Sequence, residues 1–494
     1  MPENTRLIVV SNRLPVAIEG SGKDVTVKPG KGGLVTALAP VLKNRGGLWI
    51  GWPGSAGKIS NELKDEFARF AKEAGYGLQS VALTEEEVNK FYKGFANEII
   101  WPLFHDFQSR CNFDPEYYET YVNVNDKFAR AIAKSSRESD YCWVHDYHLM
   151  HVASKLKERG VRRNMGFFLH IPFPPIDIYL KNPWRAEIVR ALMDFDLVGF
   201  QTLRDRRNFQ RALKTLYPNT VTRGRWPVVR VEFEDRQVNV GYFPISINFK
   251  EFSDIARSSE CAKRANDLHD ALKKRTIIFG ADRLDYTKGI PHRLKAMRSF
   301  LKRHPEVRGK VKLVQVVVPS RESVPEYQAQ KAEIDSLVGE INGEFSSENW
   351  IPIHYLYRNL NRDELTAYYR ASRIALITPL RDGMNLVAKE YCACNLSEDG
   401  VLVVSEFTGA AAQLQAGAIL VNPHDEIGVA EALYQAFMME KHARIERMHQ
   451  LRTIVRKYDI FWWVDSFLEA AFGRLLQDFP QQDSVDYSVD EIDF

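Results

Sequence analysis

The sequence predicts an α/β fold built on parallel, doubly wound sheets. Short, continuously apolar runs recur along the chain, as is typical of strands that are buried on both faces of a parallel sheet. Amphipathic stretches of helical length alternate with these runs. The runs expected to form strands are Leu7–Val10, Tyr141–Val144, Gly166–Leu169, Leu197–Phe200, Thr276–Phe279, Leu313–Val318, Ile374–Ile377 and Val401–Val404. The stretches expected to form helices include Asn61–Glu73, Asn125–Ser135, His292–Lys302 and Arg362–Ala371.

The length of the chain predicts two domains. At 494 residues it exceeds the size at which a single hydrophobic core stops growing. The strand–helix pattern also restarts at Arg275, after a polar connector with helical character over 254–274. We therefore expect a first domain over 1–248 and a second over 249–480, whose last helix is a candidate to pack back on the first domain. Ligands of such sheets bind beyond the carboxyl ends of the strands, so the loops at those ends should carry the chemistry.

Composition excludes several classes of protein. The net charge is only +3 and the basic residues are scattered, which argues against nucleic acid and membrane surfaces as partners. The amino-terminal residues lack an apolar signal core and no window is apolar for the length of a bilayer, so we expect a cytoplasmic protein. Five cysteines, an odd number, suit no disulfide framework. The acidic segment 481–494 is expected to be a disordered tail.

The loops of the first domain offer phosphate and sugar contacts. A glycine-rich segment over Lys28–Leu34 precedes a helix, where backbone N–H groups approach a phosphate, although a plain tight turn explains it equally well. No Gly-Lys-Ser/Thr ends this segment, so it is not a Walker loop. Aromatic side chains in Gly-rich or Pro-rich surroundings are platforms for sugars, with core packing as the alternative. The aromatic residues in question are Trp52, Tyr92 and Trp101.

Charged and imidazole side chains follow two further strands of the first domain. Asp146 is placed to accept hydrogen bonds from sugar hydroxyls and His170 to donate one. A zinc site made of His145, His148 and His170 is a weaker alternative, because the two loops lack the usual ligand spacing. We therefore expect no metal.

In the second domain, strand ends carry cations and carboxylates. Arg283 and Lys288 flank a turn into a helix, an arrangement that suits a diphosphate and the charge that grows on it as it leaves. Arg321 follows the next strand, and its forked guanidinium suits a monoester phosphate. Asp382 lies in a Gly-containing turn before a helix, and Glu390 lies about two turns further on, where a carboxylate can bind both hydroxyls of a ribose.

Taken together, the motifs resemble those of the trehalose-6-phosphate synthases, a family of retaining glycosyltransferases with the GT-B fold of two facing Rossmann-like domains. They occur in order from residue 11 to about residue 425. The matching segments are Ser11–Arg13, Gly32–Leu34, Gly51–Trp52, Trp101–Pro102, His145–His148, His170–Pro174, Arg283–Gly289 and Arg381–Glu390. The resemblance implies transfer of glucose from UDP-glucose to glucose 6-phosphate, with retention, to give α,α-trehalose 6-phosphate and UDP.

The resemblance also implies roles for single residues. On the acceptor side, Arg13, Tyr92, Trp101 and Arg321 bind the phosphate of glucose 6-phosphate, Trp52 shapes the pocket and Asp146 binds sugar hydroxyls. On the donor side, Gly33, Arg283 and Lys288 hold the diphosphate, and His170 and Asp382 bind the transferred glucose. The remaining donor contacts come from the backbone of Leu360, which holds uracil, from Gly383, Met384, Asn385, Leu386 and Val387, and from Glu390, which binds ribose. The candidates for catalysis are Arg283, Lys288, Asp382, His170 and Asp146.

No pair of carboxylates typical of a double-displacement mechanism stands out. The family instead implies front-face transfer, in which a diphosphate oxygen takes the acceptor proton and no cofactor or metal is required. A GT-B transferase with another acceptor and a non-catalytic sugar-phosphate sensor stay open as alternatives. The family further implies a possible homo-oligomer, with a trehalose-phosphate phosphatase or regulatory subunits as partners. The acidic tail and the missing signal peptide suggest a fungal member.

Overall fold

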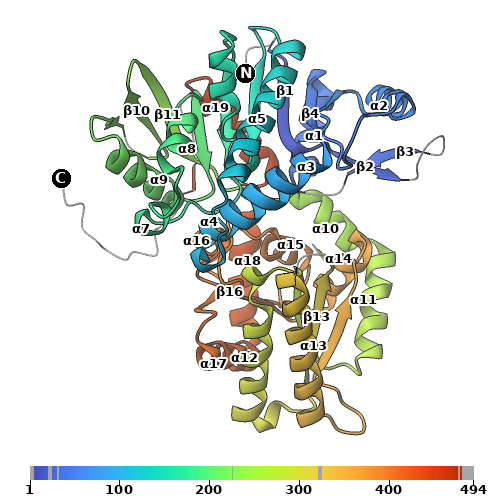
Figure 1. Ribbon diagram of the computed structural model, residues 1–494. Coiled ribbons are helices and arrows are strands. Elements are labelled where there is room, and N and C mark those ends of the chain that lie inside the picture. Colours follow the sequence, from blue (N-terminus) through green and yellow to red (C-terminus); the bar gives the residue numbers. More distant parts are fainter. Residues whose placement is uncertain are drawn as a thin grey trace. The chain divides into compact units, whose positions relative to one another are not determined.

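The computed structural model describes residues 5–19, 25–30, 33–224, 226–320, 325–474, 476, 479 and 480. The chain divides into two compact units (Figure 1). The first consists of the described residues up to Ile245 together with those from Phe461 onward, and the second runs from Ser246 to Ile460. The predicted acidic tail, 481–494, lies outside the described residues.

Within the described residues, the first unit is built on a nine-stranded sheet. Across the sheet the strands are β5 (Gly77–Ser80), β4 (Leu48–Trp52), β1 (Leu7–Arg13), β6 (Tyr141–His145), β7 (Asn164–Phe168), β8 (Leu197–Phe200), β11 (Arg236–Tyr242), β10 (Val228–Phe233) and β9 (Val221–Arg223). Strands β5 to β11 pair in parallel, and β10 and β9 add an antiparallel edge. The chain proceeds outward from β1 through β4 to β5, and in the other direction from β6 through β7 to β8, so the strand order reverses between β1 and β6.

Helices connect the parallel strands of the first unit. They are α1 (Gly33–Arg45), α2 (Asn61–Ala74), α3 (Glu85–Glu87), the π-helix η2 (Val88–Ile100), α4 (Trp101–Phe104), α5 (Pro115–Ser135), α6 (Val152–Glu158), α7 (Ile176–Tyr179), α8 (Arg185–Leu192) and α9 (Leu203–Leu216). A small hairpin of β2 (Val16–Glu19) and β3 (Thr26–Pro29) follows β1. Local chemistry sets the helix ends: Asp114 accepts a hydrogen bond from the N–H of Glu116 and Pro115 opens α5, as proline does without loss at a first helical position.

The last helix among the described residues belongs to the first unit. Helix α19 (Ile460–Ala471), red in Figure 1, buries Trp463 and Phe467 completely. The ring of Phe467 stacks on Trp143 of β6 with centroids 4.2 Å apart, and Trp463 lies 5.0 Å from the same ring. The indole N–H of Trp463 donates to the carbonyl of Phe243. The carboxyl-terminal part of the chain therefore completes a core that begins with the first strand.

The second unit has, in its described residues, a six-stranded parallel sheet. The strand order is β14 (Ile353–Tyr357), β13 (Val311–Val318), β12 (Thr276–Arg283), β15 (Ile374–Ile377), β16 (Val401–Ser405) and β17 (Ile419–Val421). This is the Rossmann order 3-2-1-4-5-6, in which the strand order reverses between β12 and β15. Its helices are α10 (Phe249–Arg257), α11 (Ser259–Ala271), α12 (Ile290–Arg303), α13 (Pro325–Phe345), α14 (Arg362–Ala371), α15 (Leu386–Cys394), α16 (Gly409–Leu414), α17 (Glu426–Met438) and α18 (Lys441–Lys457).

The predicted α/β class and the predicted strands are confirmed, with small differences in bounds. The strand expected to end at Leu169 ends at Phe168, and the helix expected from Asn125 begins at Pro115. The antiparallel edge and the π-helix were not predicted. All five cysteines carry free thiols. Within the described ranges, no helix is both long enough and apolar enough to cross a membrane.

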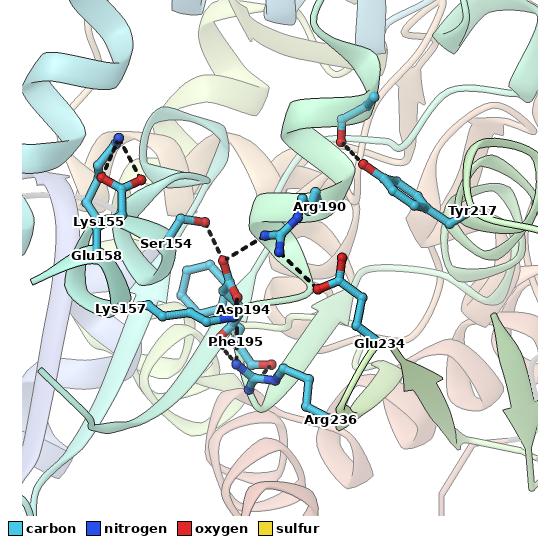
Figure 2. A network of polar contacts seen from close by, with 11 residues as sticks. Ser154, Lys155, Lys157, Glu158, Arg190, Asp194, Phe195, Tyr217, Glu234 and Arg236 are labelled. Carbon is cyan, nitrogen blue, oxygen red and sulfur yellow. Dashed lines mark hydrogen bonds and ion pairs between the residues drawn. The ribbon is translucent and has the colours of Figure 1, made fainter. Parts of the chain in front are cut away.

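A network of hydrogen bonds and ion pairs connects helix α6 to the amino-terminal ends of two strands in the first unit (Figure 2). The Asp194 carboxylate accepts hydrogen bonds from Ser154 Oγ at 2.7 Å and from Lys157 Nζ at 2.9 Å, both on α6. Arg236, at the start of β11, donates to the backbone carbonyls of Asp194 and Phe195. The network ties α6 to the beginnings of β8 and β11, at the end of the strands opposite to the loops expected to bind ligands.

Candidate active site

The predicted site residues gather at the two points where strand order reverses. In the first unit, Arg13 ends β1 and Asp146 directly follows β6. In the second unit, Arg283 ends β12 and Asp382 lies beyond β15. The carboxyl ends of parallel strands at such reversals are the usual ligand sites of open α/β sheets.

Arg13 lies against an aromatic ring and a glycine. Its guanidinium carbon is 4.7 Å from the centroid of the Trp52 ring. Trp52 is buried and its indole N–H donates to the carbonyl of Ser55 at 2.8 Å. Gly54 has φ 104°, and a Cβ there would come within 2.3 Å of the Arg13 guanidinium. The glycine thus leaves room for the cation, whose own side chain is exposed.

A chain of rings links the other aromatic candidates of the first unit. Tyr92, on the π-helix, lies 5.7 Å from Trp52 and stacks on His148 at 5.9 Å and 17°. His148 contacts the ring of Tyr147 at 4.0 Å, and Tyr147 lies 5.9 Å from Trp101. The structure therefore brings Arg13, Trp52, Tyr92 and Trp101 into one aromatic-walled neighbourhood, and π-helical turns often occur at functional sites.

Asp146 and His170 are joined through the backbone. The residue Asp146 has φ 77°, and its Oδ1 accepts a hydrogen bond from the backbone N–H of His170 at 3.2 Å. Burial raises the pKa of Asp146 to about 7, although hydrogen bonds from the N–H groups of Tyr147 and His170 oppose the shift. Near neutral pH this carboxyl group therefore exchanges between its neutral and ionised forms.

Two imidazoles contact each other next to Asp146. Nδ1 of His145 lies 3.2 Å from Nε2 of His170, within hydrogen-bond distance. Burial, followed by the effect of His170, holds the pKa of His145 well below its usual range. Burial lowers the pKa of His170 to about 3. Both rings are therefore neutral at physiological pH.

In the second unit, an ion pair joins two motif loops. Lys288 Nζ lies 2.6 Å from Asp382 Oδ2, and the two side chains are only 12% and 14% exposed. The same carboxylate oxygen accepts a hydrogen bond from Asn385 Nδ2 at 3.1 Å. The backbone N–H of Leu380 donates to the carbonyl of Thr287, so the two loops are also joined through their main chains.

The turn after Asp382 is held by close backbone contacts. The N–H of Gly409 donates to the carbonyl of Asp382, and the N–H of Ala410 donates to the carbonyl of Met384. A Cβ on Gly409 would lie 2.0 Å from the carbonyl oxygen of Gly383, so only glycine fits. Asn385 has φ 79° and caps α15 by accepting the N–H of Ala388. Leu386 and Val387 form the first turn of α15, whose free N–H groups suit an anion.

Glu390 lies further along α15 and is held by a tyrosine. Tyr369 donates its hydroxyl hydrogen to Glu390 Oε2 at 2.7 Å. Burial raises the pKa of Glu390, and the hydrogen bond from Tyr369 acts in the opposite direction. Leu360 is buried, 7% exposed, in the loop before α14. The hydrogen bond from Tyr369 therefore orients the Glu390 side chain in the absence of a ligand.

A buried ion pair involves Asp282, the residue before Arg283 at the end of β12. Arg293 Nη1 donates to Asp282 Oδ2 at 2.6 Å, and Arg293 Nε donates to Thr378 Oγ1 at 3.1 Å. The side chains of Arg293 and Asp282 are 0% and 3% exposed. The pair connects β12 and α12 to the end of β15, and so supports both loops that meet at Lys288.

Some predicted residues are not brought together by the described contacts. Arg321 lies outside the described residues, so its predicted phosphate contact stays a prediction. Gly33 begins α1 and Arg283 is exposed at the end of β12. Among the residues that the structure describes, no group of three or more His, Cys, Asp or Glu side chains is placed to hold a metal ion.

Sequence reasoning missed several supporting residues. Tyr369 and Arg293 lie within predicted helices, and Asp282 lies just beyond the predicted strand Thr276–Phe279, inside the longer observed β12; none of the three had a predicted role. Their signal was a polar residue inside an apolar strand or on a buried helix face, and this signal does not identify the partner. His145 was considered only as a zinc ligand, whereas its ring contacts His170.

Comparison with known proteins identifies the class. Residues 5–472 match the model of glycosyltransferase family 20, and the chain belongs to this family. Its fold is GT-B, as expected. A crystal structure of an α,α-trehalose-phosphate synthase (UDP-forming) from Burkholderia xenovorans in complex with glucose-6-phosphate covers 95% of this chain and 100% of its own, with TM-score 0.84 and 34% identity. An E. coli structure bound with UDP-2-fluoro glucose gives the same TM-score and identity, covering 96% of this chain and 100% of its own.

Curated relatives belong to the same class. The trehalose-6-phosphate synthase of Mycobacterium avium (strain 104) is 41% identical over 473 residues, which cover 94% of this chain and 95% of that protein. A bifunctional trehalose-6-phosphate synthase/phosphatase from Thermoproteus tenax is 40% identical over 475 residues, and this chain spans 63% of its length. These relatives are bacterial and archaeal, so they give no support to the expected fungal origin.

Proposed function

We propose that this chain transfers glucose from UDP-glucose to glucose 6-phosphate with retention, which gives α,α-trehalose 6-phosphate and UDP. The proposal follows from membership of glycosyltransferase family 20 and from the names of the relatives. The observation that carries it is the ion pair of Lys288 and Asp382, which joins the loop after β12, the strand that ends at Arg283, to the loop after β15. A cation fixed there suits a departing diphosphate, and the carboxylate that orients it suits sugar hydroxyls.

We assign the acceptor to the first unit. Arg13 with the neighbouring ring of Tyr92 supplies a cation and a hydroxyl donor for the 6-phosphate, and Trp101 lies in the same neighbourhood. Asp146 binds hydroxyls of the acceptor sugar. Arg321 is a further candidate for the 6-phosphate, proposed from its sequence position alone.

We assign the nucleotide sugar mainly to the second unit. Arg283 and Lys288 hold the diphosphate, and Asp382 and the turn to Val387 hold the transferred glucose, with His170 of the first unit as a further sugar ligand. Glu390 binds the ribose, and backbone of Leu360 and Gly33 binds uracil and phosphate respectively. The acceptor hydroxyl attacks the anomeric carbon on the face from which UDP leaves, and a diphosphate oxygen receives its proton. Catalysis then consists of positioning and charge stabilisation, with no metal required.

One assay tests this proposal and its alternatives. UDP release is measured with UDP-glucose and either glucose or glucose 6-phosphate, with and without EDTA, and the product anomer is identified by NMR. We expect activity with glucose 6-phosphate alone, an α,α product and no effect of EDTA. Equal activity with glucose would indicate a transferase with another acceptor. Binding of both ligands without release of UDP would indicate a non-catalytic sensor. Loss of activity in EDTA would indicate that a metal ion is required.

The synthase activity also implies a partner. The Thermoproteus tenax relative is named as a bifunctional synthase and phosphatase. We therefore propose a trehalose-phosphate phosphatase as the enzyme that consumes the product of this chain. Copurification of phosphatase activity with the purified native protein supports a physical association, and its absence under mild conditions argues against one. A homo-oligomer, also proposed, is checked by light scattering of the same sample.

A further inference from the structure

The imidazole of His145 is buried and has an unusual set of neighbours. It ends β6, is 0% exposed, and lies with its ring centroid 4.7 Å from that of Trp143 and 6.3 Å from that of Trp463. Its Nδ1 lies 3.2 Å from Nε2 of His170. Its other nitrogen, Nε2, is buried and has no hydrogen-bond partner among the described residues.

The two indole rings next to His145 offer no hydrogen-bond acceptor for an N–H at Nε2. The indole N–H of Trp463 is already used, because it donates to the carbonyl of Phe243 at 3.1 Å. Trp143 Nε1 is itself buried and likewise lacks a partner in the described part of the chain. This aromatic layer therefore already contains one buried N–H donor without an acceptor.

Two arrangements of protons satisfy the contact between the rings. A neutral imidazole carries one hydrogen, so one ring must donate and the other accept. If His170 donates through Nε2, the hydrogen of His145 must sit on its buried Nε2, which adds a second N–H without an acceptor to the same layer. If His145 donates through Nδ1, its Nε2 carries a lone pair instead, and no second N–H without an acceptor is added to the layer. Among buried backbone groups, an N–H without a partner is rarer than an under-satisfied carbonyl, and the same ranking favours the second arrangement here.

We propose that His145 is a positioning residue that donates through Nδ1 to His170 Nε2 and thereby fixes the hydrogen of His170 on Nδ1. The ring nitrogen of His170 that is left free then faces its ligand as a hydrogen-bond donor. This inference deepens the proposed function, in which His170 binds the transferred glucose, and makes His170 a donor to a sugar oxygen rather than an acceptor from a sugar hydroxyl.

The orientation of the His170 ring is fixed from several sides. Its backbone N–H donates to Asp146 Oδ1 at 3.2 Å, and its carbonyl accepts from Gln201 Nε2 at 3.5 Å. The ring packs 4.8 Å from Phe168. Because the backbone and one ring nitrogen are held, only the second nitrogen remains for a ligand. The tautomer of His170 therefore decides which ligand atom is recognised.

The test is the tautomer itself, measured in the full chain without ligand. The protein is labelled with ¹⁵N-histidine, and long-range ¹H–¹⁵N correlation distinguishes protonated from unprotonated ring nitrogens; an H170Q sample assigns the His170 signals. We expect a protonated Nδ1 and an unprotonated Nε2 for His170. A protonated Nε2 in the wild-type protein would overturn the proposal, whether or not any variant folds and whether or not the chain acts on UDP-glucose.

Three variants separate positioning from packing. H145F keeps a ring but loses the donor, so we expect His170 to shift toward the Nε2-protonated form. H145N retains an N–H donor near the position of Nδ1 and should preserve the wild-type signals. H151Q changes another buried histidine, which contacts Tyr118 at 3.3 Å, and should leave His170 unchanged. Unaltered His170 signals in folded H145F would contradict the proposal.

Kinetics provide the second readout. One lost or reversed hydrogen bond to the sugar corresponds to about a tenfold fall in kcat/KM for UDP-glucose in H145F. H145N should recover activity to within about threefold of the wild type. Equal losses in H145F and H145N would assign His145 a packing role only. An inactive wild-type protein with the expected tautomer would count against the proposed function and leave the positioning role standing.

Discussion

In the proposed function, the ion pair of Lys288 and Asp382 lies between the diphosphate and the transferred glucose. Their side chains are mostly buried, so removal of one partner leaves the other charge poorly compensated. We expect K288M to lower kcat by about 10²-fold or more, the scale reported for loss of one electrostatic group in a transition state. K295M, which breaks a more exposed pair between Lys295 on α12 and Glu333 on α13, should leave kcat unchanged. Wild-type kcat in K288M, measured by UDP release, would remove Lys288 from the mechanism.

The proposed role of Asp146 in binding the acceptor sugar predicts that acceptor affinity depends on pH. Burial raises its pKa to about 7, so the carboxylate that accepts hydrogen bonds from hydroxyls is the minor form below that pH and the major form above it. Affinity for glucose 6-phosphate should therefore rise about tenfold between about pH 6 and about pH 8 if only the ionised form binds.

The phosphate of the ligand titrates in the same range, so the comparison requires a control. The variant D146N has no titrating group at this position and retains only the dependence that belongs to the ligand. Calorimetric titrations of both proteins at several pH values give the ratio of their affinities. A ratio that stays constant with pH would show that Asp146 does not bind the acceptor as a carboxylate.

At the scale of elements, the sequence predicts those strands that are buried on both faces of a sheet, because burial requires their residues to be apolar. Strands β6 and β15, and Ile277–Phe279 of β12, are apolar runs because helices cover both faces of a parallel sheet. The antiparallel strands β10 and β9 alternate or expose their residues, and their segments lacked such a run. The π-helix over Val88–Ile100 has the apolar spacing of an ordinary helix, and its wider turn depends on what it packs against.

The same reasoning explains which parts of the site could be predicted. Strand-end motifs placed Arg13, Asp146, Arg283 and Asp382 at carboxyl ends from the sequence. The pairing of Lys288 with Asp382 joins residues 94 positions apart, so it depends on β12 and β15 being neighbours. Strand order is a property of the folded sheet, which short motifs do not contain.

The turn between β15 and α15 gives a prediction at this scale. Gly409 opens α16 with its Cα against the carbonyl of Gly383, where a Cβ would lie 2.0 Å from the oxygen. G409A should displace the turn and raise KM for UDP-glucose. G339A is the matched control: Gly339 lies within α13 with no atom near its absent Cβ, so alanine should stabilise by about 0.5–1 kcal/mol. Unaltered kinetics in G409A would show that the turn tolerates the shift.

At the scale of the whole molecule, the first unit is discontinuous in sequence. Its sheet begins with β1, and its core is completed by α19, which follows the described part of the second unit along the chain. Phe467 is fully buried and contacts Trp143 at 4.2 Å, Phe243 at 5.1 Å and Phe168 at 5.9 Å. The stability of the first unit therefore depends on residues that are more than 200 positions from most of its sheet in sequence, such as Phe467, which follows Phe243 by 224 positions.

This dependence is tested by removing the Phe467 ring. Truncation of a buried phenylalanine costs about 3–5 kcal/mol, and F467A should lower the stability of the unit that contains it by that amount. Hydrogen exchange followed by mass spectrometry should show faster exchange in peptides from β6, β7 and β8 and unchanged exchange in peptides from β12 to β16, because stability is not uniform across a structure. F461A, which removes a ring that is 38% exposed on the same helix, should change neither set by more than a small amount. Equal acceleration in both units would mean that they unfold together, and the division into separately stabilised units would then be wrong.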